Sequence, residues 1–313
     1  MNTTTIDSNW NLDHQMIALL GDSPESTLEA GRIIFGQHDT YTVLTSITVE
    51  AAQSKMYYGI NKKGQEVAIK LYLENHGSKA FERERFAHRL ISDNGGHSHI
   101  IPALEFLMEQ HSPIAIFPFV EGKTIEEIMS EKKMYREEPM DQEEIVPIVS
   151  TLCDATDDIH SLNLVHRDIK PSNVMITKPA PRLVVPQLFD FGIAWHPDIA
   201  DYDKAQHRYA TPIYMAPEKW GFSAPDKRED IFSLAALFYE LLSGEVPFKA
   251  DNLAELFHLH TQKTPISDLT KITPFVCDEV NAVIQKGLAY DPSQRYETAG
   301  EMKQAYLKAV GRK

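Results

Sequence analysis

Residues 166–173 read His-Arg-Asp-Ile-Lys-Pro-Ser-Asn, and this octapeptide is the most informative stretch of the chain. Seventeen residues beyond its end comes Asp190-Phe-Gly192, and Ala216-Pro-Glu218 follows later. Upstream, Val67-Ala-Ile-Lys70 lies in a run that predicts a β-strand. Each short motif arises often by chance, but all four in this order on suitable elements form a specific pattern.

The composition is that of a globular protein. The chain has 313 residues, of which 42% are hydrophobic and 24% charged, and its formal net charge is −14. These values exclude wholesale disorder and a collagen-like repeat, and two cysteines cannot build a disulfide framework. Because so acidic a chain is repelled by phosphate backbones, we expect no nucleic-acid partner.

The N-terminal sequence and the hydropathy indicate where the protein works. The first residues, MNTTTIDSNWNLDHQ, are polar and slightly acidic, unlike a secretory signal peptide. No uncharged apolar run approaches the roughly 18 residues that a membrane span needs. We therefore expect a cytoplasmic protein with no membrane span, and a secreted effector that acts in a host cytosol stays open as an alternative.

The secondary-structure signals change along the chain. Residues 1–37 read as an N-terminal extension, and alternating residues from Tyr41 onward predict strands. Ser78–Leu90 has the pattern of a charged amphipathic helix, and Asp141–Leu162 begins a helical second part. This order predicts an α+β fold in two lobes. The expected divisions are an extension at 1–37 and a domain at 38–310, with lobes at 38–120 and 121–310.

The four motifs together resemble those of the eukaryotic-type (Hanks-type) serine/threonine protein kinase family, in the style of eukaryotic-like kinases of bacteria. The resemblance covers about residues 38–310. It implies a bilobal protein-kinase-like fold, with an antiparallel β-sheet and one helix in the N-lobe and a mainly helical C-lobe. It also implies an ATP-dependent kinase that phosphorylates protein hydroxyls and uses Mg²⁺, with Mn²⁺ as an alternative ion.

The resemblance assigns roles to residues of the catalytic segment. Asp168 would be the catalytic base that accepts the proton of the substrate hydroxyl. Asn173 and Asp190 would hold the metal ions, because hard cations take oxygen ligands. Lys170 and Thr211 match the serine/threonine pattern of the family. The expected catalytic residues are thus Asp168, Lys170, Asn173 and Thr211.

By the same resemblance, Lys70 would hold the α- and β-phosphates of ATP. Its partner in the family is a glutamate on the next helix, where Phe81-Glu-Arg-Glu84 offers Glu82 and Glu84. The family's spacing favours Glu84. The alternative is that both carboxylates are solvated surface charges.

The adenine ring would lie in an apolar slot. Ile116–Gly122 aligns with the hinge between the lobes, which makes Phe117 the gatekeeper and places Pro118 and Val120 at the adenine edge. Ala68 and Met175 would sandwich the ring. The alternative is that these apolar residues are simply core.

The glycine-rich phosphate loop of the family is missing. No glycine lies between Gly36 and Gly59, and Ile47–Met56 occupies the position of the loop. Glycines let backbone N–H groups approach the phosphates closely. In one register Met56 lies over the adenine and the glycines are replaced by Val49, Ala51 and Ser54; in the other they are replaced by Thr48, Glu50 and Gln53.

This departure leaves two alternatives to an active protein kinase. The first is a pseudokinase, a nucleotide- or protein-binding scaffold that keeps the fold without transferring phosphate. The second is a small-molecule phosphotransferase on the same fold. The nearly complete segment Ala210–Glu218 argues against the second, because such enzymes generally lack it.

The segment after the Asp-Phe-Gly motif has an unusual composition. Arg167 corresponds to an arginine that pairs with a loop phosphate in related kinases, yet residues 193–210 contain no serine or threonine. We hypothesise that a carboxylate stands in for the phosphate; a flexible acidic loop is the alternative. The residues concerned are Asp198, Asp201 and Asp203, with Tyr202 and Tyr209 as the only phosphate acceptors there.

The negative charge is concentrated in one region. Residues 121–158 hold twelve acidic and four basic side chains, which is over half of the net charge. The resemblance places this region beside the peptide groove, so we expect protein substrates with Lys or Arg near the acceptor. A solvated helix face is the alternative, and no feature of the sequence indicates an oligomeric state.

Overall fold

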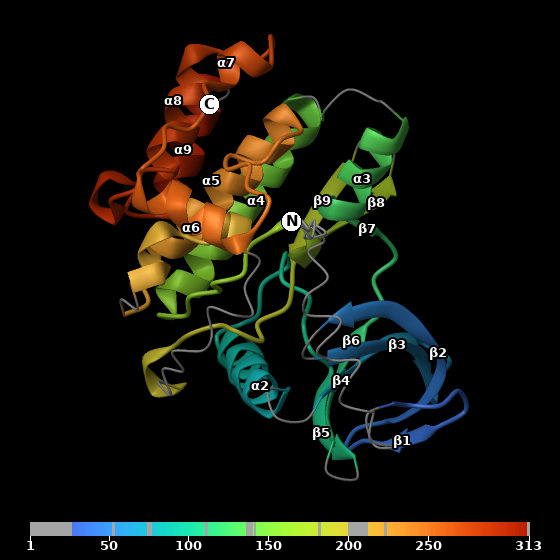
Figure 1. Cartoon of the computed structure of the whole chain (residues 1–313). Coiled ribbons are helices and arrows are strands. Elements are labelled where there is room, and N and C mark those ends of the chain that lie inside the picture. Colours follow the sequence, from blue (N-terminus) through green and yellow to red (C-terminus); the bar gives the residue numbers. More distant parts are fainter. Residues whose placement is uncertain are drawn as a thin grey trace, which may run out of the picture.

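The structure of the chain is a computed structural model that describes residues 27–51, 54–73, 77–109, 112–135, 140, 142–180, 183–199, 212–221 and 224–311. Figure 1 shows a sheet-rich lobe below and a helical lobe above it. The chain crosses between them after β6, so the hinge expected near residue 120 lies where the strands give way to helices.

Alternating apolar and polar residues form the sheet of the N-lobe. Its six strands lie in the order β1-β2-β3-β4-β6-β5, and all neighbours are antiparallel. The inward side chains, among them Ile69, Ile114 and Ile116, are fully buried. The strands are β1 Ile33–Phe35, β2 Thr40–Ala51, β3 Ser54–Asn61, β4 Glu66–Tyr72, β5 Glu105–Glu109 and β6 Ser112–Pro118.

The sheet begins earlier than the sequence suggested. Residues 33–35, which we assigned to the extension, form edge strand β1, and Ile34 is fully buried opposite Tyr41. Glu105 on the other edge strand, β5, accepts hydrogen bonds from the backbone N–H of Gln37 and, at 3.0 Å, from the Tyr41 hydroxyl. The two edges of the sheet are therefore tied together by one buried carboxylate.

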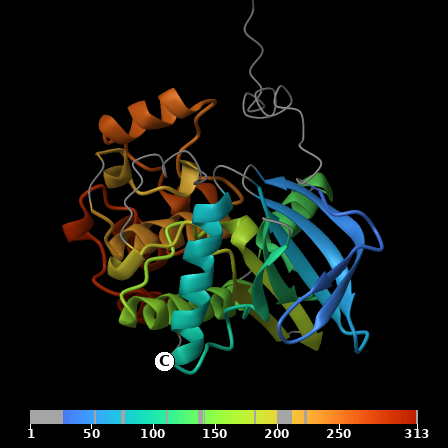
Figure 2. The same cartoon turned by 90° about the horizontal axis from the view of Figure 1, so that it is seen from below.

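Helix α2 (Gly77–Asp93) contains the amphipathic stretch expected at 78–90. Figure 2 shows it lying between the sheet and the helical lobe. Phe81 and Ala87 are buried, because the apolar face of the helix packs on the sheet on one side and on the C-lobe on the other. The helix thus presents side chains to both lobes.

The C-lobe is built around α5, whose residues Ile231–Tyr239 are all buried. Helix α5 ends at Gly244, which adopts φ 72°, a conformation that favours glycine. A three-stranded sheet, β7-β8-β9, lies next to α3. The elements are β7 Lys123–Thr124, α3 Ile125–Tyr135, α4 Gln142–Ser161, β8 Val174–Ala180, β9 Leu183–Leu188, α5 Arg228–Ser243, α6 Leu253–Thr261, α7 Leu269–Ile272, α8 Asp278–Gly287 and α9 Ala299–Ala309.

Hydropathy along the helices bears on the membrane question. Within the described ranges, no helix combines the length and the apolar character that crossing a bilayer requires.

Candidate active site

The segment 166–173 lies between α4 and β8, and a buried carboxylate holds it in place. Asp230, at the start of α5, accepts hydrogen bonds from the backbone N–H of His166 at 2.8 Å and of Arg167 at 2.7 Å. His160 contacts the same carboxylate at 2.9 Å. Arg167 adopts φ 70°, which is strained for a residue with a side chain. The bonds to Asp230 therefore maintain an unfavourable backbone conformation.

Within this segment, three predicted residues meet. Lys170 Nζ lies 2.9 Å from Oδ2 of Asp168. Asn173 Nδ2 donates to the same oxygen and to the backbone carbonyl of Asp168, both at 2.8 Å. The Asp168 side chain is 11% exposed, so it is oriented by two donors yet still reachable from solvent.

A second cluster joins the two lobes. Lys70 on β4 contacts Glu84 on α2 at 2.7 Å and Asp190, after β9, at 2.8 Å. Glu82, the other candidate partner, is 57% exposed and pairs with Arg85. Glu84 faces the sheet and Glu82 does not, because positions two apart lie on different faces of a helix.

The charges in this cluster stabilise one another. Burial lowers the pKa of Lys70, but Asp190 and Glu84 raise it to a net value above the usual range of a lysine. Burial likewise raises the pKa of Asp190, but Lys70 and then Lys170 lower it well below its ordinary value. Lys70 is therefore held as a cation and Asp190 as a carboxylate near neutral pH.

The residues expected around adenine come from both lobes and share one hydrophobic cluster. This cluster includes Ala68 on β4, Phe117 on β6, Val120 just after β6, and Met175 on β8. Phe117 is 8% exposed, and Pro118 is the last residue of β6, opposite Val67. The structure therefore brings the residues expected around adenine into one apolar cluster, beside Lys70 on β4.

The glycine-free segment forms the β2–β3 hairpin. Ala51 pairs with Ser54, and Met56 lies opposite Lys70 across β3 and β4. Ser54 is buried. The side chains of Val49 and Ala51 lie outside the described residues, as does the whole of Thr211, so their roles stay predictions.

Arg167 has a partner that the sequence did not suggest. Its Nε lies 3.4 Å from Glu229 of α5, and Lys219 Nζ donates to its carbonyl at 2.9 Å. All three residues are buried. The sequence offered one signal for this contact. Lys219 comes directly after the Ala-Pro-Glu motif, and Glu229 comes directly before Asp230.

Of the three candidate carboxylates, Asp198 is described: its side chain is 76% exposed and lies 3.8 Å from His196. Asp201 and Asp203 lie within residues 200–211, outside the described part, so the hypothesis that a loop carboxylate replaces a phosphate stays a prediction.

A buried ion pair between Arg295 and Glu218 holds the Ala-Pro-Glu motif in place. Arg295 donates to Glu218 through two nitrogens, at 2.6 and 2.7 Å, and also to the carbonyls of Arg228 and Ala289 at 2.8 Å. Its side chain is fully buried. Arg295 thus ties the Ala-Pro-Glu motif to the start of α5.

Aromatic rings connect α2 with the catalytic segment. The Phe191 ring, from the Asp-Phe-Gly motif, lies 4.6 Å from that of His166 and 5.3 Å from that of His88 on α2, measured between centroids. Burial lowers the pKa of His88 to about 3, so this ring is neutral. Sequence reasoning missed His88, although its place four residues after Glu84 puts it on the same helix face.

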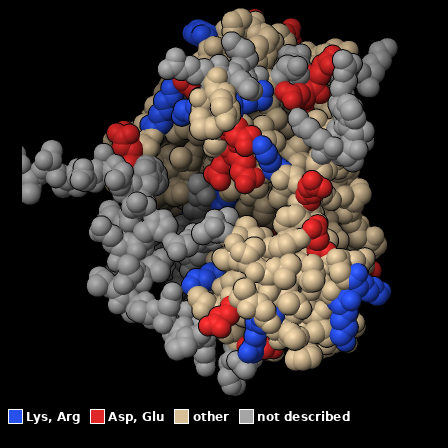
Figure 3. All heavy atoms as spheres, turned by 90° about the vertical axis from the view of Figure 1, so that its right-hand side faces the viewer, with Lys and Arg blue, Asp and Glu red and all other residues tan. Residues whose placement is uncertain are grey.

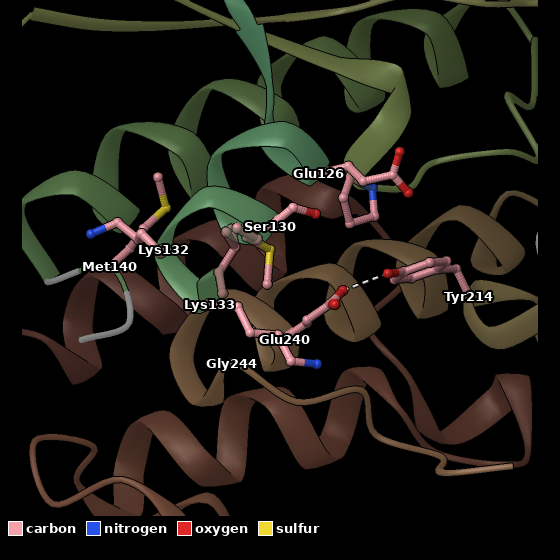
Figure 4. A pocket seen from close by; sticks show the side chains of 11 residues that line it. Glu126, Ser130, Lys132, Lys133, Met140, Tyr214, Glu240 and Gly244 are labelled. Atoms are coloured by element: carbon pink, nitrogen blue, oxygen red, sulfur yellow. Dashed lines mark hydrogen bonds between the residues drawn. The ribbon is translucent and has the colours of Figure 1, made fainter. Parts of the chain in front are cut away.

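A cavity of about 360 Å³ opens next to the catalytic segment. Pro171 of this segment is one of the lining residues. Figure 4 shows Tyr214 at the cavity together with Glu126 on α3 and Glu240 on α5. The Tyr214 hydroxyl donates to Glu240 at 2.5 Å. Burial raises the pKa of Glu240, and the hydrogen bond from Tyr214 opposes this shift.

Asp190 and Asn173 carry oxygen atoms of the kind that a hard divalent cation binds. Oδ1 of Asp190 contacts Lys70, while Oδ2 makes no hydrogen bond within the described part of the chain. Asn173 uses its amide nitrogen on Asp168, which leaves the amide oxygen on the other side of the group. Carboxylate and amide oxygens are ligands that Mg²⁺ accepts. These two residues therefore fit the predicted metal site.

Comparison with known proteins identifies the family. The protein kinase domain model matches residues 50–307. The serine/threonine-protein kinase PknB of Mycobacterium leprae is 33% identical over 194 residues, which cover 61% of this chain and 29% of the relative. The probable serine/threonine-protein kinase PknB of Corynebacterium glutamicum is 30% identical over 253 residues, which cover 76% of this chain and 37% of the relative. The chain thus spans well under half the length of these relatives.

A solved structure shares the fold. The kinase domain of Mycobacterium tuberculosis PknI aligns with a TM-score of 0.67 at 21% sequence identity, over 91% of this chain and all of that domain. The bilobal α+β fold expected from the sequence is confirmed. The chain belongs to the protein kinase domain family, among the Hanks-type, eukaryotic-like kinases of bacteria.

Proposed function

We propose that this chain is an ATP-dependent serine/threonine protein kinase. The observation that carries the proposal is the position of Lys70, held between Glu84 of α2 and Asp190 after β9. This cation brings residues from three separate parts of the sequence together beside the apolar cluster that contains Ala68 and Met175. Such an arrangement suits a nucleotide with a triphosphate tail, because apolar side chains can pack on the base and the cation accepts phosphate.

Asp168 is the residue that we assign to the acceptor hydroxyl. Its Oδ2 is oriented by Lys170 and Asn173, and the carboxylate accepts the hydroxyl proton as the acceptor oxygen bonds to the γ-phosphorus. The bond between the γ-phosphorus and the β–γ bridging oxygen breaks, and ADP leaves with the electron pair. Lys170 remains beside the reacting centre as a cation and stabilises the transferring group.

Asn173 and Asp190 would hold Mg²⁺. When bound, the ion neutralises the negative charge of the phosphates. Lys70 meanwhile keeps Asp190 ionised, because a cation at 2.8 Å disfavours protonation of the carboxylate.

Two alternatives are distinguished by what the chain retains. A pseudokinase would tolerate loss of the charged residues, yet all four are present, with Lys70 paired to Asp190 and Asn173 to Asp168. A small-molecule phosphotransferase would not need the segment 212–218, which here packs against α5 through the hydrogen bond from Ser233 to the carbonyl of Tyr214 at 2.8 Å. The first observation supports an active enzyme, and the second supports a protein acceptor.

We further propose that the preferred acceptors carry Lys or Arg nearby. Glu126 and Glu240 line the cavity next to Pro171, three residues beyond Asp168. Figure 3 shows acidic side chains gathered on the face that carries α3. Lys132 and Lys133 line the same cavity and reduce its negative potential, so the expected preference is moderate. Location in the cytoplasm and the absence of a nucleic-acid partner stay predictions.

An acceptor-peptide array with ATP·Mg²⁺ tests both proposals. We expect transfer to Ser and Thr in preference to Tyr, and faster transfer when Lys or Arg flanks the acceptor. A Glu126→Gln variant should reduce the advantage of basic peptides and leave the rate on neutral peptides unchanged. Equal rates on basic and acidic peptides would contradict the acceptor preference, and transfer to Tyr alone would contradict the serine/threonine assignment.

A further inference from the structure

Tyr72 is a buried residue with a polar contact in the centre of the N-lobe. It lies two residues beyond Lys70 on β4, so both side chains project from the same face of the strand. Its side chain is among the largest fully buried ones, and its ring packs edge-on against Phe81 of α2. A hydroxyl buried so deeply is costly unless it is hydrogen-bonded.

The partner of this hydroxyl is the carboxylate that holds Lys70. Tyr72 donates to Oε2 of Glu84 at 2.5 Å, and Lys70 contacts the same oxygen at 2.7 Å. Burial and the neighbouring Glu84 raise the pKa of Tyr72 well above its ordinary value, so the hydroxyl keeps the proton that it donates to Glu84. The other oxygen, Oε1, accepts a long bond of 3.4 Å from the backbone N–H of Phe191.

His88 is the other side chain close to this carboxylate, but it plays a weaker part. Its Nε2 lies 4.0 Å from Oε1 of Glu84, which is too far for a hydrogen bond. Of the contacts that Glu84 makes within the described part of the chain, two are short hydrogen bonds: one comes from Lys70 and the other from Tyr72.

Lys70 is shared between two carboxylates, and this makes the anchor important. Asp190 lies 2.8 Å from Lys70, almost as near as Glu84. If Glu84 could turn away from the sheet, Lys70 would follow Asp190, because nothing would balance the second attraction. The hydroxyl of Tyr72 prevents this by fixing Oε2.

We propose that Tyr72 is a positioning residue, whose hydroxyl fixes Glu84 and thereby holds Lys70 in place for the phosphates of ATP. The inference rests on the proposed kinase function. It also fits the glycine-free hairpin: with no glycine from residue 37 to residue 58, close backbone contacts to the phosphates are fewer and a well-placed lysine counts for more.

The test is the affinity of the full chain for ATP·Mg²⁺, measured by titration calorimetry on wild type and on Tyr72→Phe. The variant keeps the ring, which lies 5.1 Å from Lys70 Nζ, and removes only the hydroxyl. We expect the Kd for ATP to rise about tenfold. In steady-state assays the KM for ATP should rise similarly, with no change in the KM for the acceptor peptide.

Tyr41→Phe is the matched control. Its hydroxyl, on β2, also donates at 3.0 Å to a buried glutamate of the same sheet, Glu105 on edge strand β5, which makes no contact with Lys70. A loss of folded protein lowers the number of sites and the apparent kcat without changing Kd, so this control separates positioning from stability. We expect Tyr41→Phe to keep the wild-type Kd.

A second measurement does not depend on the single variant. In a Glu84→Ala background, Tyr72→Phe should change Kd less than twofold, since no carboxylate remains to be fixed. The inference is overturned if Tyr72→Phe binds ATP as the wild type does, or if it costs the same affinity in both backgrounds. Binding by the wild type without turnover would refute the kinase function alone, and absence of binding would refute both.

Discussion

Asp230 offers the sharpest test of how the fold supports the site. Its carboxylate is fully buried and bridges the backbone N–H groups of His166 and Arg167 at 2.8 and 2.7 Å. Replacing it with asparagine preserves the shape but leaves one oxygen where there were two. The new amide N–H₂ then faces a backbone N–H, so one donor loses its acceptor.

The size of the effect follows from these contacts. Losing a hydrogen bond to a charged group costs about 1.5–3 kcal/mol, and a buried N–H without a partner costs about 1–3 kcal/mol. Together, Asp230→Asn should lower the free energy of unfolding by about 2.5–6 kcal/mol. Because Arg167 would no longer be held at φ 70°, Asp168 would shift, and a displacement near 1 Å lowers kcat about 100-fold.

Urea unfolding and kcat for the folded fraction measure the two effects separately. Asp157→Asn is the matched control, because Asp157 accepts two backbone N–H groups, of Ala299 at 2.8 Å and Gly300 at 2.7 Å, far from the catalytic segment. It should lose about 1 kcal/mol of stability and keep the wild-type kcat. The reasoning is refuted if Asp230→Asn keeps its kcat, or if Asp157→Asn loses as much.

Two further predictions concern stability. Glu218→Gln should lower the free energy of unfolding by about 3 kcal/mol, because it leaves the buried Arg295 without its charge partner. The control, Glu82→Gln on the surface, should cost under about 0.5 kcal/mol. Equal losses of the two variants in urea unfolding would contradict this. Burial lowers the pKa of His88 to about 3 and that of His260 to about 4. The unfolded chain therefore binds more protons below pH 6.5, and stability should fall with falling pH by up to about 1.4 kcal/mol per unit for each histidine. Denaturation at pH 7, 6 and 5 should show a shallower slope for His88→Phe, and an unchanged slope would be evidence against a buried neutral imidazole.

The residues assigned to the site were found in the sequence through the resemblance of their short motifs to those of the kinase family, and their catalytic roles stay predictions. Lys70, Asp168, Asn173 and Asp190 lie in short motifs, and the structure brings all four to the junction of the lobes. The choice of Glu84 over Glu82 also came from the family's spacing, and the contact between Lys70 and Glu84 agrees with it.

The supporting contacts were harder to predict, since they depend on how far one element packs into another. Strand alternation places Tyr72 on the same face as Lys70, but it does not say that α2 brings Glu84 within 2.5 Å of the hydroxyl. Lys219 and Glu229 pack on Arg167 only because the chain folds back over more than fifty residues. Edge strand β1 was missed for a similar reason: three residues carry too short a pattern, and the tie from Glu105 to the Tyr41 region is a tertiary contact.

The central claim is that this chain transfers phosphate from ATP to protein hydroxyls with Asp168 as the base. Radiolabelled phosphate transfer from ATP·Mg²⁺ to a serine/threonine peptide mixture, compared between wild type and Asp168→Ala, tests it most directly. The account predicts steady incorporation by the wild type and a loss of at least about 100-fold in the variant, because no other described side chain occupies the place of that carboxylate. Equal incorporation by the two proteins, or none by the wild type, would contradict it.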